Sequence, residues 1–253
     1  MCNSPPAGTR NARSSGAGRP SKRYRATEPQ LSPQVPVRHD TVLVNLLKRA
    51  LSLLPREQAD VLRLHYWRRY GATLLGLERH HGVRATHFLH ETHHLPGLER
   101  ALTMPKRDRV ALQRLPGRKF ILTNAPAAYA KRVLTELDLV SCFEGVISIE
   151  SMRVFGDLRP KPDARMLRVV LARHGLSAAR CVLVEDTLAN LKAARAVHMK
   201  TVWMQHYLAR SAHGPEAGVS WRRRPAWVCA RINRLSALRT WGARWSDPHT
   251  DTR

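Results

Sequence analysis

The sequence has few cysteines, few acidic residues and no long apolar run. Its four cysteines are scattered without a C-x-x-C pair, which argues against a disulfide framework and against a cysteine-rich zinc site. No apolar stretch approaches the roughly 20 residues that a membrane-spanning helix requires. No apolar segment of the signal-peptide kind follows the basic N-terminus. We therefore expect a soluble protein of the reducing cytoplasm, with no membrane partner.

Acidic residues are scarce, with 19 Asp+Glu against 43 Lys+Arg and a net charge of +24. The excess is concentrated at the ends, because residues 1–56 contain 10 Lys+Arg against 2 Asp+Glu, and residues 208–253 contain 9 against 3. A dense positive field attracts phosphate backbones regardless of sequence. Basic tails are more often solvated and disordered than specific binding arms. We therefore favour solvated tails over a nucleic-acid-binding role for the two basic ends.

Composition divides the chain into four segments. Residues 1–40 are rich in Pro, Ser, Gly, Ala and Arg without hydrophobic periodicity, so we expect disorder there. Residues 41–97 predict helices, including an amphipathic helix over TVLVNLLKRALSLL at 41–54. Residues 98–207 predict the main α/β domain, and residues 208–253 form a basic C-terminal segment.

Strand-like and helical patterns alternate through the α/β domain. Such alternation predicts a Rossmann-like parallel sheet with helices on both faces, because parallel neighbours need a crossover long enough to hold a helix. In chain order the segments are KFILTN, AAYAKRVLTELDL, GVISI, DARMLRVVLARHG, CVLVED, LANLKAARAVH and TVWM.

Polar residues follow the predicted strands at their carboxyl ends. KFILTN ends in Thr123 and Asn124, CVLVED ends in Glu185 and Asp186, and the loop after GVISI contains Lys161. Ligands of parallel sheets bind beyond the carboxyl ends of the strands, so we expect these groups to converge on one rim. Carboxylate oxygens suit Mg²⁺, and Lys and hydroxyl groups suit phosphoryl oxygens. The pattern predicts a magnesium-assisted phosphate site.

ILTNAP, RPKPD and VLVEDTLANLKAAR, in this order, resemble three motifs of the haloacid-dehalogenase-like superfamily. The resemblance runs from roughly Glu57 to Tyr207. It implies that Thr123, with Asn124 beside it, contacts a phosphoryl oxygen, and that Lys161 steadies the charged intermediate.

The same resemblance implies a metal site and a substrate class. Asp186 would ligate Mg²⁺, with support from Glu185 directly or through water, and Asn190 stands where relatives often have a second carboxylate. The block YWRRYGATLLGL resembles the helical cap of the pyrimidine 5′-nucleotidase branch. The expected function is therefore a phosphomonoester hydrolase, with a pyrimidine nucleoside monophosphate as its substrate.

Relatives use an aspartate nucleophile and a second aspartate two residues later, in a D-x-D motif that ends the first strand. Before Glu57 this sequence contains just two acidic residues, Glu28 and Asp40, and neither stands in a D-x-D context. Asp40 comes before an apolar run instead of after it. A carboxylate nucleophile divides hydrolysis into two easier steps, so its loss removes the main route. We predict that the first core strand is absent and that the chain as written is inactive.

Two questions stay open at this point. The N-terminal segment has the composition of a reading frame translated out of register or of a misplaced start, and an authentic basic extension is the rival. The second functional hypothesis is a non-catalytic protein that binds phosphorylated ligands, or nucleic acid through its basic ends.

Three further groups have a functional and a plainer interpretation. Tyr66, Trp67 and Tyr70 could stack on a base, although we favour core packing. The arginines in WRRRPAWVCARINRL, Arg222 to Arg224, could bind a polyanion, although we favour a surface segment that closes the domain. A histidine-rich stretch could bind a metal, although we favour a solvated helix surface; it contains His80, His81, His87, His90, His93 and His94.

Overall fold

The computed structural model describes residues 56–205 and 223–239. The predicted disorder of residues 1–40 and the predicted helix over 41–54 lie outside these residues, as does the segment in which a first strand was sought. Among the described residues, no helix is both long and apolar enough to cross a membrane.

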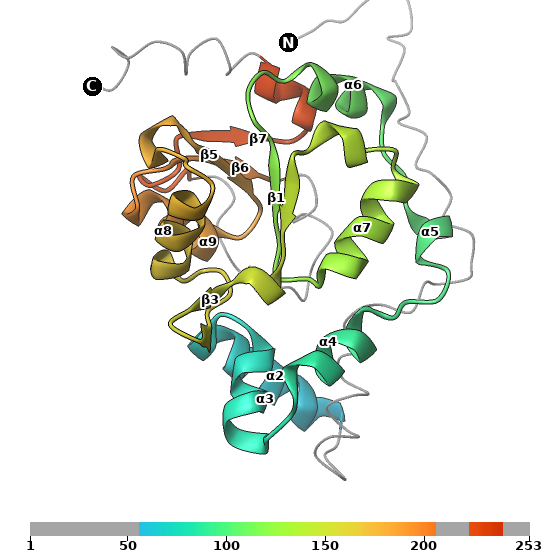
Figure 1. The fold of residues 1–253 in the computed structure, drawn as a ribbon, viewed down its shortest axis with the longest axis vertical. Coiled ribbons are helices and arrows are strands. Elements are labelled where there is room, and N and C mark those ends of the chain that lie inside the picture. The colour runs from blue at the N-terminus through green and yellow to red at the C-terminus, as the bar shows by residue number, and fades with distance from the viewer. Residues whose placement is uncertain (1–55, 206–222, 240–253) are drawn as a thin grey trace, which may run out of the picture. The chain divides into compact units, whose positions relative to one another are not determined.

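The described part begins with a helical unit, residues 56–93, which we call the cap. It comprises α2 (Arg56–Tyr70), α3 (Thr73–His81) and α4 (Ala85–His93). Tyr66, Leu74 and Leu77 form the centre of its apolar cluster. At Gly76 an added Cβ would lie 2.1 Å from Cγ of Tyr66, so α3 can pack against this ring because the residue is glycine. In Figure 1 the cap lies below the strands, near the hairpin that contains β3.

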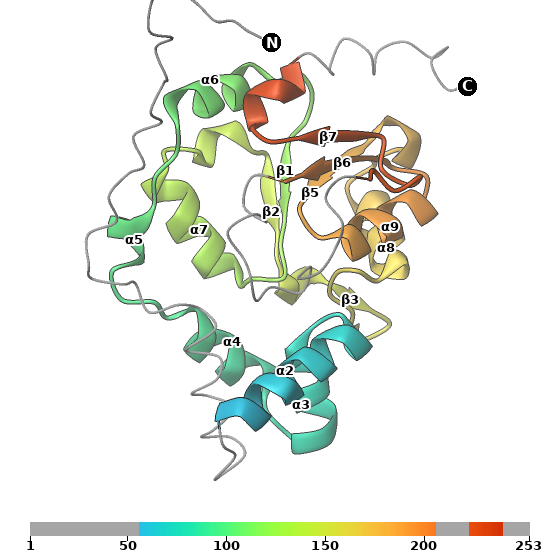
Figure 2. The same cartoon turned by 180° about the vertical axis from the view of Figure 1, so that it is seen from behind.

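The main strands form two parallel groups. β1 (Phe120–Leu122) pairs with β2 (Gly145–Ile147), and β6 (Lys200–Met204) lies between β5 (Val182–Glu185) and β7 (Ala230–Ile232). Figure 2 shows both groups from behind. The connecting elements are α5 (Leu98–Ala101), α6 (Lys106–Arg114), α7 (Ala127–Glu136), α8 (Ala164–Arg173), α9 (Leu188–Ala196) and an antiparallel hairpin of β3 (Arg153–Val154) and β4 (Asp157–Leu158).

Helices cover both faces of β1 and β2, as the predicted α/β architecture requires. Side chains alternate along a strand, so Phe120 and Leu122 point to one face and Ile121 points to the other. Phe120 and Leu122 pack against the cluster that contains Leu167 of α8. Ile121 packs against a separate cluster that contains Leu134 of α7. The parallel pairing and this two-sided cover confirm the predicted fold class.

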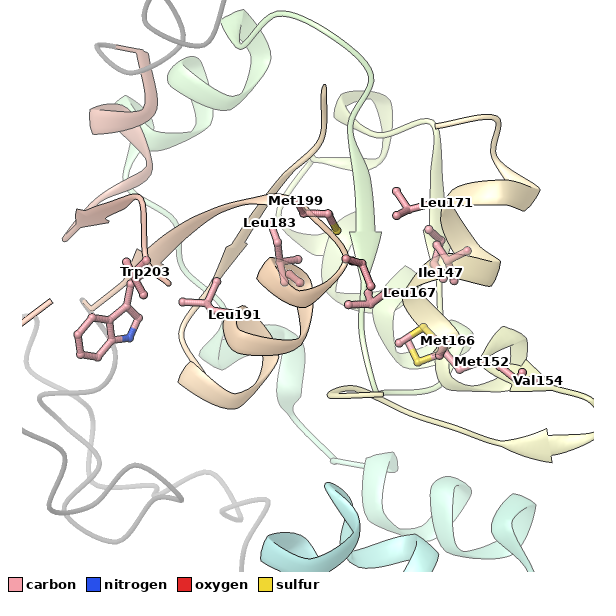
Figure 3. Close-up of a cluster of buried hydrophobic side chains, with 14 residues drawn as sticks. Ile147, Met152, Val154, Met166, Leu167, Leu171, Leu183, Leu191, Met199 and Trp203 are labelled. Carbon is pink, nitrogen blue, oxygen red and sulfur yellow. The ribbon is translucent and has the colours of Figure 1, made fainter. Parts of the chain in front are cut away.

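The described strands do not form one continuous sheet. No backbone ladder between described residues joins β1 to β5. The two groups nevertheless share an apolar layer, in which Ile147 of β2, Leu183 of β5 and Leu167 of α8 belong to one cluster (Figure 3). Among the described residues, the two groups of strands are therefore joined by side-chain packing.

Residues 223–239 contribute a core strand that the sequence interpretation did not include. Val202 and Met204 of β6 pair with Ala230 and Ile232 of β7, and all four side chains are buried. The side chain of Arg224 binds the backbone of its own segment, because its Nη1 donates to the carbonyls of Val228 and Cys229 at 2.7 and 2.6 Å. The segment therefore belongs partly to the interior, while Arg222 lies outside the described residues.

Candidate functional site

A cavity of about 1040 Å³ lies between the cap and the carboxyl ends of the strands. The cap wall is the set of lining residues from α2, α3 and the turn between them, and the core wall is the set from the strand ends and following loops. The cap wall consists of Trp67, Arg68, Arg69, Tyr70, Gly71, Leu75, Glu78 and Arg79. The core wall includes Asn124, Lys161, Glu185, Asp186 and Asn190.

The structure brings four of the five main predicted site residues into this cavity. Asn124 follows β1, Lys161 follows β4, and Glu185 and Asp186 end and follow β5. Thr123 is not among the residues that line the cavity. Its backbone N–H donates to Ile147, and its Oγ1 accepts a hydrogen bond from the N–H of Ala125 at 3.0 Å. Of the two polar residues that follow β1, Asn124 therefore lines the cavity and Thr123 does not.

Lys161 and Glu185 form an ion pair at the floor of the cavity. Lys161 Nζ donates to Glu185 Oε2 at 2.6 Å, and the two side chains are 13% and 10% exposed. Burial by itself would raise the pKa of Glu185, but the charge of Lys161 and several hydrogen bonds lower this pKa to about 2. Glu185 is therefore a carboxylate at neutral pH, and the lysine is held beside Asp186.

Asp186 has the opposite shift. Burial, a hydrogen bond with Glu185 and the negative charge of Glu185 raise the pKa of Asp186 from 3.8 to about 6. Thr187 Oγ1 donates to Asp186 Oδ1 at 3.2 Å, and the buried indole of Trp203 donates to the Asp186 carbonyl at 2.9 Å. These two hydrogen bonds hold the loop that contains Asp186. Among the described residues, the Asp186 carboxylate forms no ion pair of its own, because Lys161 is paired with Glu185.

Asn124 holds the backbone of Lys161 through both atoms of its amide. Its Nδ2 donates to the Lys161 carbonyl at 3.1 Å, and its Oδ1 accepts from the Lys161 N–H at 2.9 Å. A side-chain amide can satisfy one peptide donor and one peptide acceptor in this way. Asn124 therefore positions the lysine, a role that the predicted contact with a phosphoryl oxygen did not include.

The loop that carries Lys161 is also held from its two sides. Asp163 caps α8, because its carboxylate accepts from the N–H groups of Arg165 and Met166. On the cap side, an added Cβ at Gly71 would lie 2.4 Å from Cδ of Pro162, and Gly71 has a φ of +81°. The close approach of cap and loop therefore requires glycine at position 71.

The core wall offers a donor set that fits one Mg²⁺ ion with help from a ligand. Asp186 and Glu185 are adjacent carboxylates, and both burial and the negative charge of Glu185 raise the pKa of Asp186. A cation bound beside them would favour the charged form of Asp186. No cluster of three or more acidic, His or Cys side chains suited to a metal occurs in the described ranges. Mg²⁺ is commonly bound by one or two carboxylates together with substrate phosphates and waters. The residues present are consistent with that kind of site.

Several residues that build the cavity carried no signal in the sequence. Arg159 pairs with Asp157 and Asp163 at 3.0 and 3.3 Å, and Arg79 reaches the cavity from the end of α3. Arginine is common in this chain, so nothing in its spacing distinguished these two. Gly71 could have been noticed, because a glycine between two helical patterns often marks a turn with positive φ.

The aromatic and histidine groups divide between the two interpretations. Tyr66 is buried in the cap as expected, and Tyr70 packs against the same apolar cluster while it also lines the cavity. Trp67 lines the cavity and belongs to none of the apolar clusters of the described residues. His81 and His80 contact the hydroxyls of Tyr66 and Tyr70, each at 2.7 Å. Among the described histidines, none belongs to a group that could hold a metal.

Comparison with known proteins identifies one family. The profile of a hydrolase family described as haloacid dehalogenase-like hydrolase matches residues 39–198, more than half of the chain. The match begins upstream of Glu57, where we placed the start of the resemblance, and therefore includes Asp40.

Solved structures with a similar fold include three hydrolase-like proteins. A conserved haloacid dehalogenase-like protein from Agrobacterium tumefaciens has a TM-score of 0.49 and 20% identity, over 83% of this chain and 91% of its own. A HAD phosphatase from Thermococcus onnurineus has a TM-score of 0.46 and 18% identity, over 79% and 86%. An L-2-haloacid dehalogenase from Xanthobacter autotrophicus has a TM-score of 0.47 and 14% identity, over 79% and 91%.

Proposed function

We propose, from the premise that this chain belongs to the haloacid dehalogenase-like hydrolases, that its cavity binds a phosphomonoester together with Mg²⁺. The observation that carries the proposal is the buried Lys161–Glu185 pair beside Asp186, in the core wall of a cavity whose opposite wall is the cap. Asp186 and Glu185 would hold the ion, and Lys161 would face the phosphoryl oxygens. Bound Mg²⁺ would neutralise charge on those oxygens.

We propose a pyrimidine nucleoside monophosphate as the ligand. Trp67 and Tyr70 line the cap wall of the same cavity. Trp67 belongs to none of the apolar clusters of the described residues, so its ring is available for contact with a ligand. Aromatic rings accept nucleobases by stacking, a contact that contributes about 1–3 kcal/mol per base. The site then combines a phosphate end on the core wall with a base end on the cap wall.

We further propose that the chain as written binds this ligand without turning it over. The other carboxylates of the core wall are engaged, because Glu185 pairs with Lys161, and Asp157 and Asp163 pair with Arg159. Asp186 is the candidate metal ligand, and Glu78 belongs to the cap wall. Among the described residues of the core wall, no spare carboxylate is therefore placed to attack a phosphoryl group, and Asp40 lies outside the described residues.

Calorimetric titration of the full chain with uridine 5′-monophosphate, with and without Mg²⁺, tests the binding. We expect Mg²⁺-dependent binding that Asp186→Asn weakens at least tenfold, since a charged metal ligand is lost. Asp138→Asn is the matched control, because Asp138 is an 81% exposed carboxylate outside the cavity. Binding that is independent of both Mg²⁺ and Asp186 would contradict the proposal.

Phosphate release from the same nucleotide tests the absence of turnover. We expect no release above the blank, and robust Mg²⁺-dependent hydrolysis would contradict the inactivity. Translation of the other two reading frames of the coding DNA upstream of residue 57 is a separate test. A strand ending in D-x-D in either frame would identify the present N-terminal segment as misread. The role of the basic ends in nucleic-acid binding remains a prediction, because residues 1–55, 206–222 and 240–253 lie outside the described residues.

A further inference from the structure

The two walls of the cavity carry charges of opposite sign. The cap wall has three arginines, Arg68, Arg69 and Arg79, and one carboxylate, Glu78. The core wall has two cations and four carboxylates, and these six residues are Asp157, Arg159, Lys161, Asp163, Glu185 and Asp186. A ligand that spans the cavity therefore meets a negative floor, where Mg²⁺ would bind, and a positive cap.

The cations of the two walls differ in their partners. On the core wall, Arg159 is paired with two aspartates and Lys161 is paired with Glu185. On the cap wall, Arg69 contacts Tyr70, with Nε 3.3 Å from the hydroxyl and the guanidinium 5.7 Å from the ring centre. Arg68 and Arg79 form no ion pair or hydrogen bond with any described residue. Two guanidinium groups therefore line the cavity without a carboxylate.

The cavity is also larger than a phosphoryl group requires. Its volume of about 1040 Å³ is at the upper end of ordinary small-molecule pockets. A ligand anchored by its phosphate on the core wall therefore leaves room for further groups at the cap wall, which contains Trp67, Arg68 and Arg79. Arginine is well suited to bind a carboxylate or a second phosphate, because its planar fork can donate two parallel hydrogen bonds.

We infer that Arg68 and Arg79 bind a second anionic group of the ligand, remote from its phosphoryl group. The inference rests on the proposed function and narrows its substrate class to phosphomonoesters that carry another negative charge at the base end. Glu78 opposes this binding, because it adds a negative charge to the cap wall.

Two nucleotides that differ by one carboxylate provide the test. Orotidine 5′-monophosphate is uridine 5′-monophosphate with a carboxylate on the base, so both share the phosphate, the ribose and the ring. With Mg²⁺ present, calorimetry on the full chain should show about tenfold tighter binding of the orotidine nucleotide. The preference should decline as salt is raised, because exposed charges are screened.

Variants of the cap wall separate this inference from the proposed function. The double variant Arg68→Gln/Arg79→Gln should abolish the preference, so that the two nucleotides bind with equal affinity. Glu78→Gln should increase the preference. Arg84→Gln, at an exposed cap arginine outside the cavity, is the matched control and should change neither.

The outcomes are distinct for the two ideas. Equal affinity for the two nucleotides, or a preference that survives in the double arginine variant, overturns the second anion site. Loss of Mg²⁺ dependence, or insensitivity to Asp186→Asn, overturns the proposed function. A preference that persists without Mg²⁺ and disappears in the double variant would support the anion site while rejecting the metal site.

Discussion

The two groups of strands differ in what holds them in place. β5, β6 and β7 are joined by continuous parallel ladders, and Val202 at the centre is fully buried. β1 and β2 form their own ladder, and no described backbone hydrogen bond links β1 to β5. The link consists of the shared apolar layer and of side chains at the rim, where Asn124 holds Lys161 and Lys161 contacts Glu185.

This difference shows where the site depends on side chains. The Asp186 loop is supported by a three-stranded group and by the indole of Trp203. Asn124 belongs to the other group, so its alignment with Asp186 passes through Lys161. In a continuous sheet the backbone ladder would fix the relative position of both strand ends. Among the described residues, a few polar contacts link the two strand ends, so changes to these contacts should affect the site more than changes within either group.

The largest expected effect concerns the shared apolar layer. Leu167 is 3% exposed and belongs to the cluster that includes residues of both strand groups. Leu167→Ala should lower the free energy of unfolding by about 3 kcal/mol or more, because it creates a cavity. Urea unfolding measures this loss, and hydrogen exchange should show reduced protection in both β1 and β5.

Leu238→Ala is the matched control for this experiment. Leu238 is also 3% exposed, but it belongs to the cluster on the other face of β6 and β7. A similar loss of stability is expected, with protection reduced in β6 and β7 and retained in β1. If Leu167→Ala left the protection of β1 unchanged, the idea of a shared layer would be wrong.

The ion pair at the rim should have the next largest effect. Lys161→Met removes the charge that compensates Glu185, and a buried carboxylate left without its partner costs about 3 kcal/mol of stability. The double variant Lys161→Met/Glu185→Gln should recover most of this loss, as measured by chemical denaturation. Phosphate-ligand binding should be lost in both. Equal destabilisation of the single and double variants would show that the pair does not hold the rim.

Asn124→Ala should have a smaller effect on stability. It removes two hydrogen bonds to the Lys161 backbone, at an expected cost of about 2 kcal/mol. Because these contacts position Lys161, which in turn contacts Glu185 of β5, Mg²⁺-dependent nucleotide binding should weaken as well. Thr201→Val is the control, since Thr201 Oγ1 donates to the Trp227 carbonyl at 2.6 Å within the other group. It should lower stability without changing nucleotide binding.

The smallest expected effect is a pH dependence of Mg²⁺ binding. The pKa of Asp186 is raised to about 6, and the ion must compete with the proton on this carboxylate. The apparent affinity should be constant above pH 7 and should fall about tenfold per pH unit below 6, as calorimetry can measure. Without the ion, the raised pKa means that stability from Asp186 is greatest below pH 4 and is lost as pH rises toward 6. Asp186→Asn should abolish both trends.

Local patterns in the sequence predicted most of the elements but not all of their pairing. The strands around Ile121, Val146 and Leu183 and the helices between them were expected from short apolar runs and helical periods. The strand Ala230–Ile232 was missed, because three residues in an arginine-rich stretch show no alternation. The division of the described strands into separate ladders could not be predicted either, since pairing depends on residues far apart in the chain.

The sequence predicted which residue types the candidate site contains, but it did not predict the role of each residue. Glu185, Asp186, Lys161 and Asn124 were identified from their positions after strands, and they line one cavity. The role of Asn124 as a clamp on the Lys161 backbone required three-dimensional contacts.

The sequence by itself determined which short segments become strands and helices, because side-chain periodicity and backbone propensity act over a few residues. It also determined the order of the polar groups that end the strands. Only the tertiary structure decided that the described strands form separate ladders, that Asn124 binds Lys161, and that the cap places Arg68 and Arg79, which have no ion pair with a described residue, in the wall of the cavity. The reason is physical: these features depend on which distant surfaces pack together, and packing is set by the whole set of buried contacts.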